Sequence, residues 1–157
     1  MGPRLPVWDE AVENLIIKPD MAATVVLSGS NELIYAAVEG EDRIDISTAN
    51  FGRGLETLLS QARLSSGCGK PTPKTGFLLL DGTIHLAATS VLSNHELEQS
   101  IDNSAVLIML RRIDEEFLGG LATDFELNDM RLHSPQNDSS ALLPIMGITG
   151  TKLATLA

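Results

Sequence analysis

Apolar residues recur at helical spacing in three stretches of the chain. In the first stretch they stand at positions i, i+4, i+7 and i+8, namely Trp8, Val12, Leu15 and Ile16. This spacing predicts an amphipathic helix over about residues 7–18, which Pro19 ends because proline cannot continue a helix. The second stretch, with apolar positions Phe51, Leu55, Leu58, Leu59 and Ala62, predicts a long helix that ends before Gly67. The third predicts a short helix that starts at Asp114 and contains Phe117, Leu118 and Leu121.

Short β-rich runs separate these helical stretches. Residues 23–27 and 33–38 flank the turn-forming segment Ser28-Gly-Ser-Asn31 and predict a hairpin. Residues 76–80 and 83–89 predict a second hairpin, because Asp81-Gly82 is a strong two-residue turn signal. Further strands are predicted at residues 105–110, at 130–132 and from 142 onward.

The predicted order is therefore helix, hairpin, long helix, hairpin, strand, short helix and strands. Paired neighbouring strands with helices inserted between them favour an antiparallel sheet with helices packed on it. We expect an α+β fold of the PAS or Cache type with an N-terminal helix. The length of 157 residues suits one domain, with the N-terminal helix at about 7–18 and an α/β core at about 22–157.

The chain is strongly acidic, with 21 acidic and 11 basic residues and a formal net charge of −10. A surface of this sign repels phosphate backbones, so we expect no nucleic-acid partner. The basic residues are scattered, and Arg111-Arg112 is the single adjacent pair. Direct binding to anionic lipid is therefore disfavoured too.

Several sequence features bear on where the chain resides. No run reaches the roughly 18 apolar residues of a membrane span, and the first residues lack the pattern of a signal peptide. The lone Cys68 leaves the compartment open between cytosol and bacterial periplasm. The strand-like stretch Lys152-Leu-Ala-Thr-Leu-Ala157 carries no polar tail, so we expect a domain truncated at both ends from a larger protein.

No set of residues predicts catalysis, a metal or a cofactor. His85, His95 and His133 are widely separated and lack metal-ligand spacing. His85 is expected on a partly solvated sheet face, with a ligand contact as the alternative. Cys68 has no neighbouring histidine or asparagine pattern, and Gly67-Cys-Gly-Lys70 lacks the first glycine of a phosphate loop. We expect a protein that is not an enzyme.

Three blocks of sequence resemble a known family, the fourth CHASE class. Trp8-Asp-Glu-Ala-Val-Glu-Asn-Leu15 is similar to the start of its first helix, and Asn31-Glu-Leu-Ile-Tyr-Ala36 to a strand that ends in Tyr-Ala or Tyr-Ser. Leu110-Arg-Arg-Ile-Asp-Glu-Glu-Phe-Leu118, with the leucines that follow it, resembles its short helix and returning strand. The three blocks occur in the family's order along nearly the whole chain.

The resemblance implies an extracellular sensory domain of a bacterial or archaeal membrane receptor. Such a domain is periplasmic, lies between two membrane helices and relays a signal to a cytoplasmic diguanylate cyclase, phosphodiesterase, histidine kinase or chemotaxis module. Its function is a population shift caused by an unknown small-molecule ligand, transmitted through a homodimer. The alternative is a protein–protein interaction module without a small-molecule ligand.

The resemblance also suggests where a ligand binds. In a PAS-like fold the pocket is expected between the sheet and the helix that runs from Phe51 to Leu64, or in the loops at the ends of that helix. The candidate ligand-binding residues there are Tyr35, Arg53, His85 and Arg111. Each of the four is also explicable as a surface or packing residue.

Overall fold

The computed structural model describes eight stretches of the chain. These are residues 22–39, 41–42, 52–66, 71–80, 82–92, 104–128, 130–134 and 143–157. The N-terminal helix expected over about residues 7–18 lies outside the described residues, as do Cys68 and His95.

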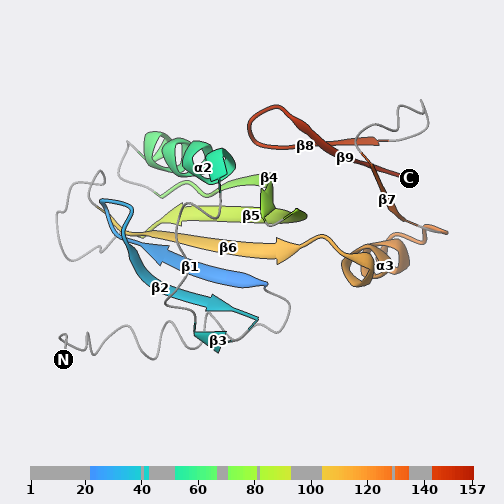
Figure 1. The fold of residues 1–157 in the computed structure, drawn as a ribbon, viewed down its shortest axis with the longest axis horizontal. Helices are drawn as coiled ribbons and strands as arrows, with labels where there is room; N and C mark the ends of the chain where they lie inside the picture. The colour runs from blue at the N-terminus through green and yellow to red at the C-terminus, as the bar shows by residue number, and fades with distance from the viewer. Residues whose placement is uncertain are drawn as a thin grey trace.

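The larger of two sheets contains the strands β1 (Ala23–Leu27), β2 (Leu33–Val38), β3 (Glu41–Asp42), β4 (Lys74–Leu80), β5 (Thr83–Val91) and β6 (Val106–Arg112). This main sheet has the order β3-β2-β1-β6-β5-β4, and every neighbouring pair is antiparallel (Figure 1). The α+β class and the antiparallel sheet expected from the sequence are confirmed.

Both predicted hairpins are present in the main sheet. β1 pairs with β2 across a turn in which Asn31, at φ 65°, donates its N–H to Ser28 O at 3.0 Å. β4 pairs with β5 around Gly82, whose φ of 75° lies in the left-handed region that glycine adopts freely. Local turn chemistry therefore joins each pair of strands as the sequence predicts.

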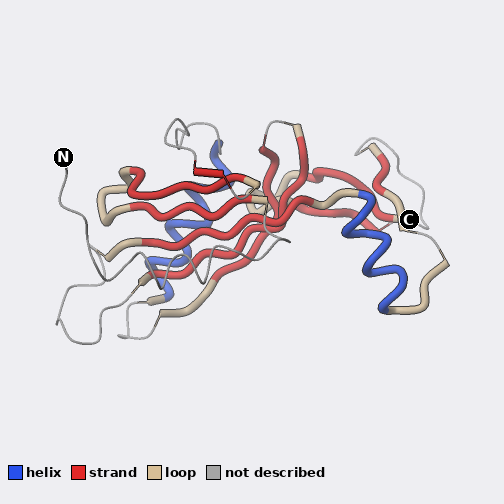
Figure 2. The backbone as a smooth tube through the Cα atoms, turned by 90° about the horizontal axis from the view of Figure 1, so that it is seen from below, coloured by secondary structure: helices blue, strands red, loops and turns tan. Residues whose placement is uncertain are grey.

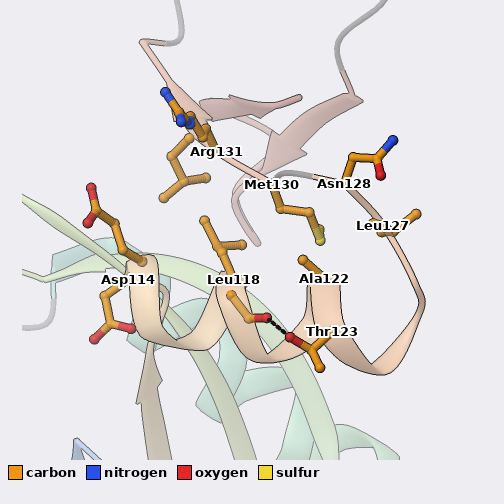
Figure 3. Close-up of a pocket in the computed structure, with 11 residues that line it drawn as sticks. Asp114, Leu118, Ala122, Thr123, Leu127, Asn128, Met130 and Arg131 are labelled. Carbon is orange, nitrogen blue, oxygen red and sulfur yellow. Dashed lines mark hydrogen bonds between the residues drawn. The ribbon is translucent and has the colours of Figure 1, made fainter.

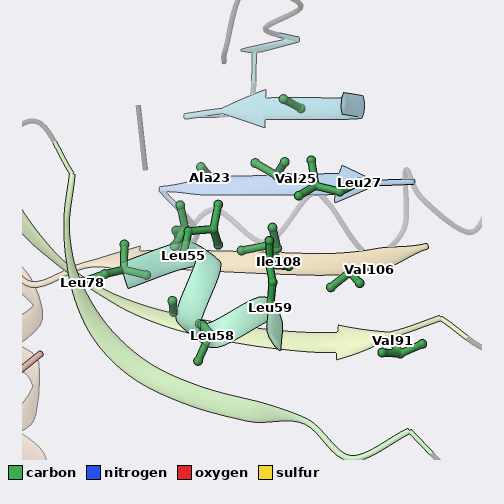
Figure 4. Close-up of a cluster of buried hydrophobic side chains, with 13 residues drawn as sticks. Ala23, Val25, Leu27, Leu55, Leu58, Leu59, Leu78, Val91, Val106 and Ile108 are labelled. Carbon is green, nitrogen blue, oxygen red and sulfur yellow. The ribbon is translucent and has the colours of Figure 1, made fainter. Parts of the chain in front are cut away.

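The helix α2 (Gly52–Ser65) covers one face of the main sheet (Figure 1). Its apolar stripe, which includes Leu55, Leu58, Leu59 and Ala62, is buried. The sheet contributes Val25, Val106, Ile108 and Leu110 to the same cluster, with α2 lying across the strands (Figure 4). Each leucine buried in this way stabilises the fold by roughly 1.5–3 kcal/mol, so this interface is the main hydrophobic core.

A smaller unit follows the main sheet and lies beyond the end of β6 (Figures 1 and 2). It consists of the helix α3 (Glu115–Asp124) and the strands β7 (Leu132–His133), β8 (Leu143–Met146) and β9 (Lys152–Leu156), in the sheet order β7-β9-β8. A second hydrophobic cluster, with Ile84, Ile113, Leu118 and Ala154 buried at its centre, joins this unit to β4 and β5. The short helix and the late strands predicted from the sequence are confirmed.

Candidate functional site

A pocket of about 830 Å³ lies between α3 and the segment that returns along it into β7 (Figure 3). Its lining residues come from residues 114–132 alone: Asp114, Glu115, Leu118, Gly119, Ala122, Thr123, Leu127, Asn128, Met130, Arg131 and Leu132. The volume is within the range of pockets that hold small organic ligands, roughly 300–1,000 Å³. We refer to it as the α3 pocket.

The start of α3 places two carboxylates at one end of the α3 pocket. Asp114 is the N-cap residue, and its carboxylate accepts a 2.9 Å hydrogen bond from the N–H of Phe117. Glu115 follows in the first turn, where a negative charge interacts favourably with the helix dipole. The cap therefore defines where the helix begins and also where these acidic side chains stand.

The end of α3 turns the chain back along the helix. Glu126 has a φ of 55°, and its N–H donates to Thr123 O, while the N–H of Leu127 donates to Ala122 O at 2.8 Å. These two bonds form a Schellman motif, in which the residue with positive φ is usually glycine. After this turn the chain runs back toward β7, and both Ala122 and Leu127 line the pocket.

The wall opposite α3 is held in place by the C-terminal strand. The N–H of Arg131 donates to Ala157 O at 3.0 Å, and the N–H of Ala157 donates to Arg131 O at 3.0 Å. Leu132 then pairs with Leu156 in the ladder between β7 and β9. The pocket therefore lies between a helix and a strand edge that residues far along the chain stabilise.

The chemistry of the lining suits binding. Leu118 is buried, and together with Met130 and Leu132 it belongs to the second hydrophobic cluster, which gives the pocket an apolar floor. The Thr123 hydroxyl donates to Gly119 O at 2.9 Å (Figure 3). The lining contains carboxylates and one guanidinium group but no histidine, cysteine or serine. It offers no nucleophile paired with a base.

The four predicted ligand-binding residues lie in different parts of the fold. Arg53 is exposed on the first turn of α2. Tyr35 pairs with Val26 in the β1–β2 ladder, whereas the neighbouring pair Val25 and Ala36 faces the α2 cluster. Because successive residues of a strand alternate between faces, Tyr35 lies on the face away from α2.

Arg111 has a specific partner in the smaller unit. Its guanidinium carbon lies 4.7 Å from the centroid of the Phe117 ring, a cation–π contact between β6 and the first turn of α3. This contact connects the main sheet to the helix that forms the pocket.

His85 is buried in β5, with 5% of its surface exposed. The expected position on a partly solvated face is therefore wrong, because the ring lies where β5 is covered on both sides. Its Nδ1 is 3.0 Å from Thr83 O, and since a carbonyl oxygen can only accept, Nδ1 is the donor. Leu86, the next residue in β5, pairs with Arg111 of β6. The predicted ligand-binding residues His85 and Arg111 therefore lie on adjacent strands.

None of the four residues lines the α3 pocket, and their role in ligand binding stays a prediction. The interface expected to hold a ligand, between α2 and the sheet, is filled by Leu55, Leu58 and Ala62. The loops at the ends of α2, residues 43–51 and 67–70, lie outside the described residues.

The α3 pocket was not predicted from the sequence, although the helix that forms it was. Asp114 marked the start of α3, but Glu126 carries no turn signal because the left-handed position lacks glycine. Nothing local to the sequence indicated that the chain returns along the helix at that residue.

Two other features, a metal cluster and a membrane-spanning helix, are absent from the described residues. No group of three or more histidine, cysteine, aspartate or glutamate side chains within these stretches is arranged to hold a metal ion. No helix among the same residues is long and apolar enough to cross a membrane.

Residues 7–133 match the model of a known family, the CHASE4 domain. The chain belongs to the CHASE4 family. CHASE4 domains are extracellular sensory modules of signalling proteins, and the family is not catalytic. No curated protein matches the chain. The α3 pocket lies wholly inside the part of the chain that the CHASE4 model covers.

Proposed function

We propose that this CHASE4 domain is the periplasmic ligand-input domain of a transmembrane signalling protein such as a diguanylate cyclase, phosphodiesterase or histidine kinase. The observation that carries the proposal is the α3 pocket within the family-matched region. A ligand that binds one conformation more tightly shifts the population toward that conformation. Membrane helices on both sides of the domain and a homodimer carry the shift to the output domain.

The lining of the α3 pocket suggests the kind of molecule that it takes. Leu118, Met130 and Leu132 suit a compact apolar body. Glu115 at the helix N-terminus and Arg131 on the opposite wall suit polar groups of opposite charge. The proposed ligand is a small organic molecule that carries at least one charged group.

The arrangement of the main sheet supports the PAS or Cache type of fold for this domain. Two antiparallel hairpins are separated by α2, which packs on one face of the sheet that they form with β6. In the proposed domain the amphipathic segment at about residues 7–18 is the N-terminal helix that links the sheet to the membrane.

A thermal-shift screen of metabolites tests the proposal, with two variants of α3 as a matched pair. Glu115 lines the pocket, whereas the adjacent Glu116, which is also exposed, does not. A ligand at 100 times its Kd stabilises the wild type by about 2.7 kcal/mol, which raises Tm by several degrees. We expect Glu115→Gln to reduce this shift and Glu116→Gln to keep it. A screen without any stabilising metabolite, or an equal response of both variants, would count against ligand sensing at this pocket.

The alternative function, protein interaction without a small ligand, is favoured by one observation at the end of α3. Phe125 is 69% exposed and Leu127 is 50% exposed, so two large apolar side chains, two positions apart in sequence, face solvent. In that case Phe125→Ser abolishes signalling by the full-length protein while the Tm of the isolated domain stays unchanged. Retained signalling by this variant would exclude this surface as the docking site.

A further inference from the structure

The turn between β8 and β9 contacts the main sheet through one side chain. Ile148 packs against the first hydrophobic cluster, the one formed by α2 and the main sheet. Three other apolar residues of this hairpin, Ile145, Leu153 and Leu156, pack against the second cluster. Ile148 is therefore the point at which the C-terminal hairpin reaches the α2 side of the fold.

Two glycines create the space that Ile148 occupies. A Cβ atom placed on Gly76 in β4 would stand 2.9 Å from Ile148 Cδ1, and one on Gly54 in α2 would stand 3.6 Å from Ile148 Cγ2. A contact of 2.9 Å is too short for carbon atoms. The isoleucine side chain lies directly on the backbone of β4, close to the first turn of α2, in a site that only glycine at position 76 leaves open.

Backbone hydrogen bonds hold the same turn in place. The N–H of Ile148 donates to Phe77 O at 2.9 Å, and Gly147 forms a parallel bridge with Phe77. Within the turn, the N–H of Gly147 donates to Thr151 O at 2.7 Å. The side chain and the backbone of one short turn are thus both engaged with the edge strand β4.

The other end of the same hairpin supports the α3 pocket. β9 runs from the turn to Ala157, which exchanges two hydrogen bonds with Arg131 in the pocket wall. Leu132 in that wall pairs with Leu156. One strand therefore links the wall of the pocket to the turn that docks on β4 and α2.

We propose that Ile148 is the contact through which occupation of the α3 pocket acts on α2 and on the adjoining part of β4. A ligand that moves β7 moves β9 with it, because the two strands are hydrogen-bonded, and the displacement reaches the docked turn. Packed contacts with two discrete arrangements transmit such changes. This inference rests on the proposed function, because it requires that the pocket be occupied in one signalling state.

Hydrogen exchange of the intact 157-residue chain tests the docking. Ile148→Ala removes the side chain from its site, and we expect exchange about tenfold faster in residues 143–157 and 74–80, with little change in β1 and β6. Leu143→Ala, a truncation of an exposed residue in the same hairpin, serves as the matched control. Equal effects of Ile148→Ala and Leu143→Ala would overturn the docking role. Should Ile148→Ala unfold the domain, Ile148→Val removes Cδ1 alone and is expected to accelerate the same peptides less strongly.

A double-mutant cycle tests the fit of the side chain in its site. Gly76→Ala introduces the Cβ that meets Ile148 Cδ1, so by itself it accelerates exchange of the hairpin. In the Ile148→Ala background Cδ1 is absent, and the added effect of Gly76→Ala is expected to fall by about half or more. Strict additivity of the two changes would contradict direct contact as the reason.

A thiol adduct in the pocket tests the coupling without knowledge of the natural ligand. Thr123→Cys, in a Cys68→Ser background, is modified with N-ethylmaleimide so that the adduct occupies the α3 pocket. We expect the adduct to change exchange in residues 52–66 and 74–80 by about twofold or more, and Ile148→Ala to abolish that change. The same adduct on Glu116→Cys, outside the pocket, is expected to leave these peptides unchanged.

The coupling is refuted if the Thr123→Cys adduct has no effect on these peptides, or if its effect is the same with and without Ile148. Because the adduct replaces the ligand, this result does not depend on the metabolite screen. A screen without hits argues against the proposed ligand sensing and leaves the coupling through Ile148 untouched. An adduct without effect argues against the coupling through Ile148 and leaves the proposed ligand sensing untouched.

Discussion

Two arginines of the described chain differ in what their guanidinium groups contact. Arg63, near the end of α2, donates to Ser104 O at 3.1 Å, to Ser28 O at 3.2 Å and to Asn31 Oδ1 at 3.0 Å. Arg112 pairs with Glu39 at 2.8 Å, and their side chains are 45% and 64% exposed. The first arginine joins three segments of the main sheet unit, and the second forms a surface ion pair.

Replacing each of these arginines with alanine is expected to affect stability very differently. Arg63→Ala removes the guanidinium donor of the partly buried Ser104 O together with both bonds to the β1–β2 turn, which costs about 1–3 kcal/mol of unfolding free energy. Arg112→Ala removes an exposed pair, which is worth about 1 kcal/mol or less. Urea denaturation of both variants measures the two values. A loss for Arg63→Ala no larger than that for the exposed pair, below about 1 kcal/mol, would show that Arg63 does not hold the segments together.

Residue types predicted contacts less well than they predicted elements. His85 was expected to be partly solvated and is buried, because β5 is covered by both hydrophobic clusters. Arg111, a candidate ligand contact, stacks on Phe117. The burial of His85 and the stacking of Arg111 both result from tertiary packing, so the type of side chain could not indicate its surroundings.

At the scale of elements, the backbone conformation of glycines separates two kinds of position. Gly120 lies in the helical backbone of α3, and Gly82 has a φ of 75° in the β4–β5 turn. A Cβ at either position meets no atom within 4 Å. Both sites therefore have room for a Cβ atom, and the two glycines differ in the φ angle of the backbone.

The same substitution is consequently expected to have opposite effects at these two glycines. Gly120→Ala stabilises the domain by about 0.5–1 kcal/mol, because alanine loses less conformational entropy in a helix. Gly82→Ala destabilises it by roughly 1–2 kcal/mol, because a side chain is strained at positive φ. Thermal and urea unfolding of both variants provide the measurement. Changes of the same sign would contradict the assignment of the two conformations.

The ends of elements followed local signals only where those signals were strong. Asp114 marked the start of α3, and Gly82 marked the turn of the second hairpin, as predicted. The end of α3 did not follow a glycine, because Glu126 takes the left-handed conformation at φ 55°. Hydrogen bonds from Glu126 and Leu127 to the last turn of α3 compensate for that strain.

At the scale of the whole molecule, the packing of α2 on the main sheet forms the larger of the two hydrophobic clusters in the described residues. Leu58 is fully buried in this interface, whereas Leu64 on the same helix is 82% exposed. Both residues are leucines in a regular helix, so their helix propensities are equal. A difference between the stability losses of their alanine variants therefore measures the tertiary packing of Leu58.

Truncation of these two leucines is expected to separate packing from helix propensity. Leu58→Ala creates a cavity in the core and costs about 2–5 kcal/mol. Leu64→Ala changes stability by about 0.5 kcal/mol or less. Urea denaturation monitored by circular dichroism, with equal slopes for both variants, gives the comparison. A small loss for Leu58→Ala would mean that α2 contributes little to the stability of the main sheet.

The sequence by itself determined α2, α3, the two hairpins, the antiparallel α+β class and the family, because these depend on spacing and turn chemistry between residues close along the chain. The tertiary structure alone decided that Arg131 meets Ala157, that Ile148 lies against Gly76, and that α3 borders a pocket. The two contacts join residues that are 26 and 72 positions apart in the sequence. The pocket depends on the turn at Glu126, for which the sequence has no glycine. Local spacing carries no information about them, because they depend on how the two hydrophobic clusters pack together.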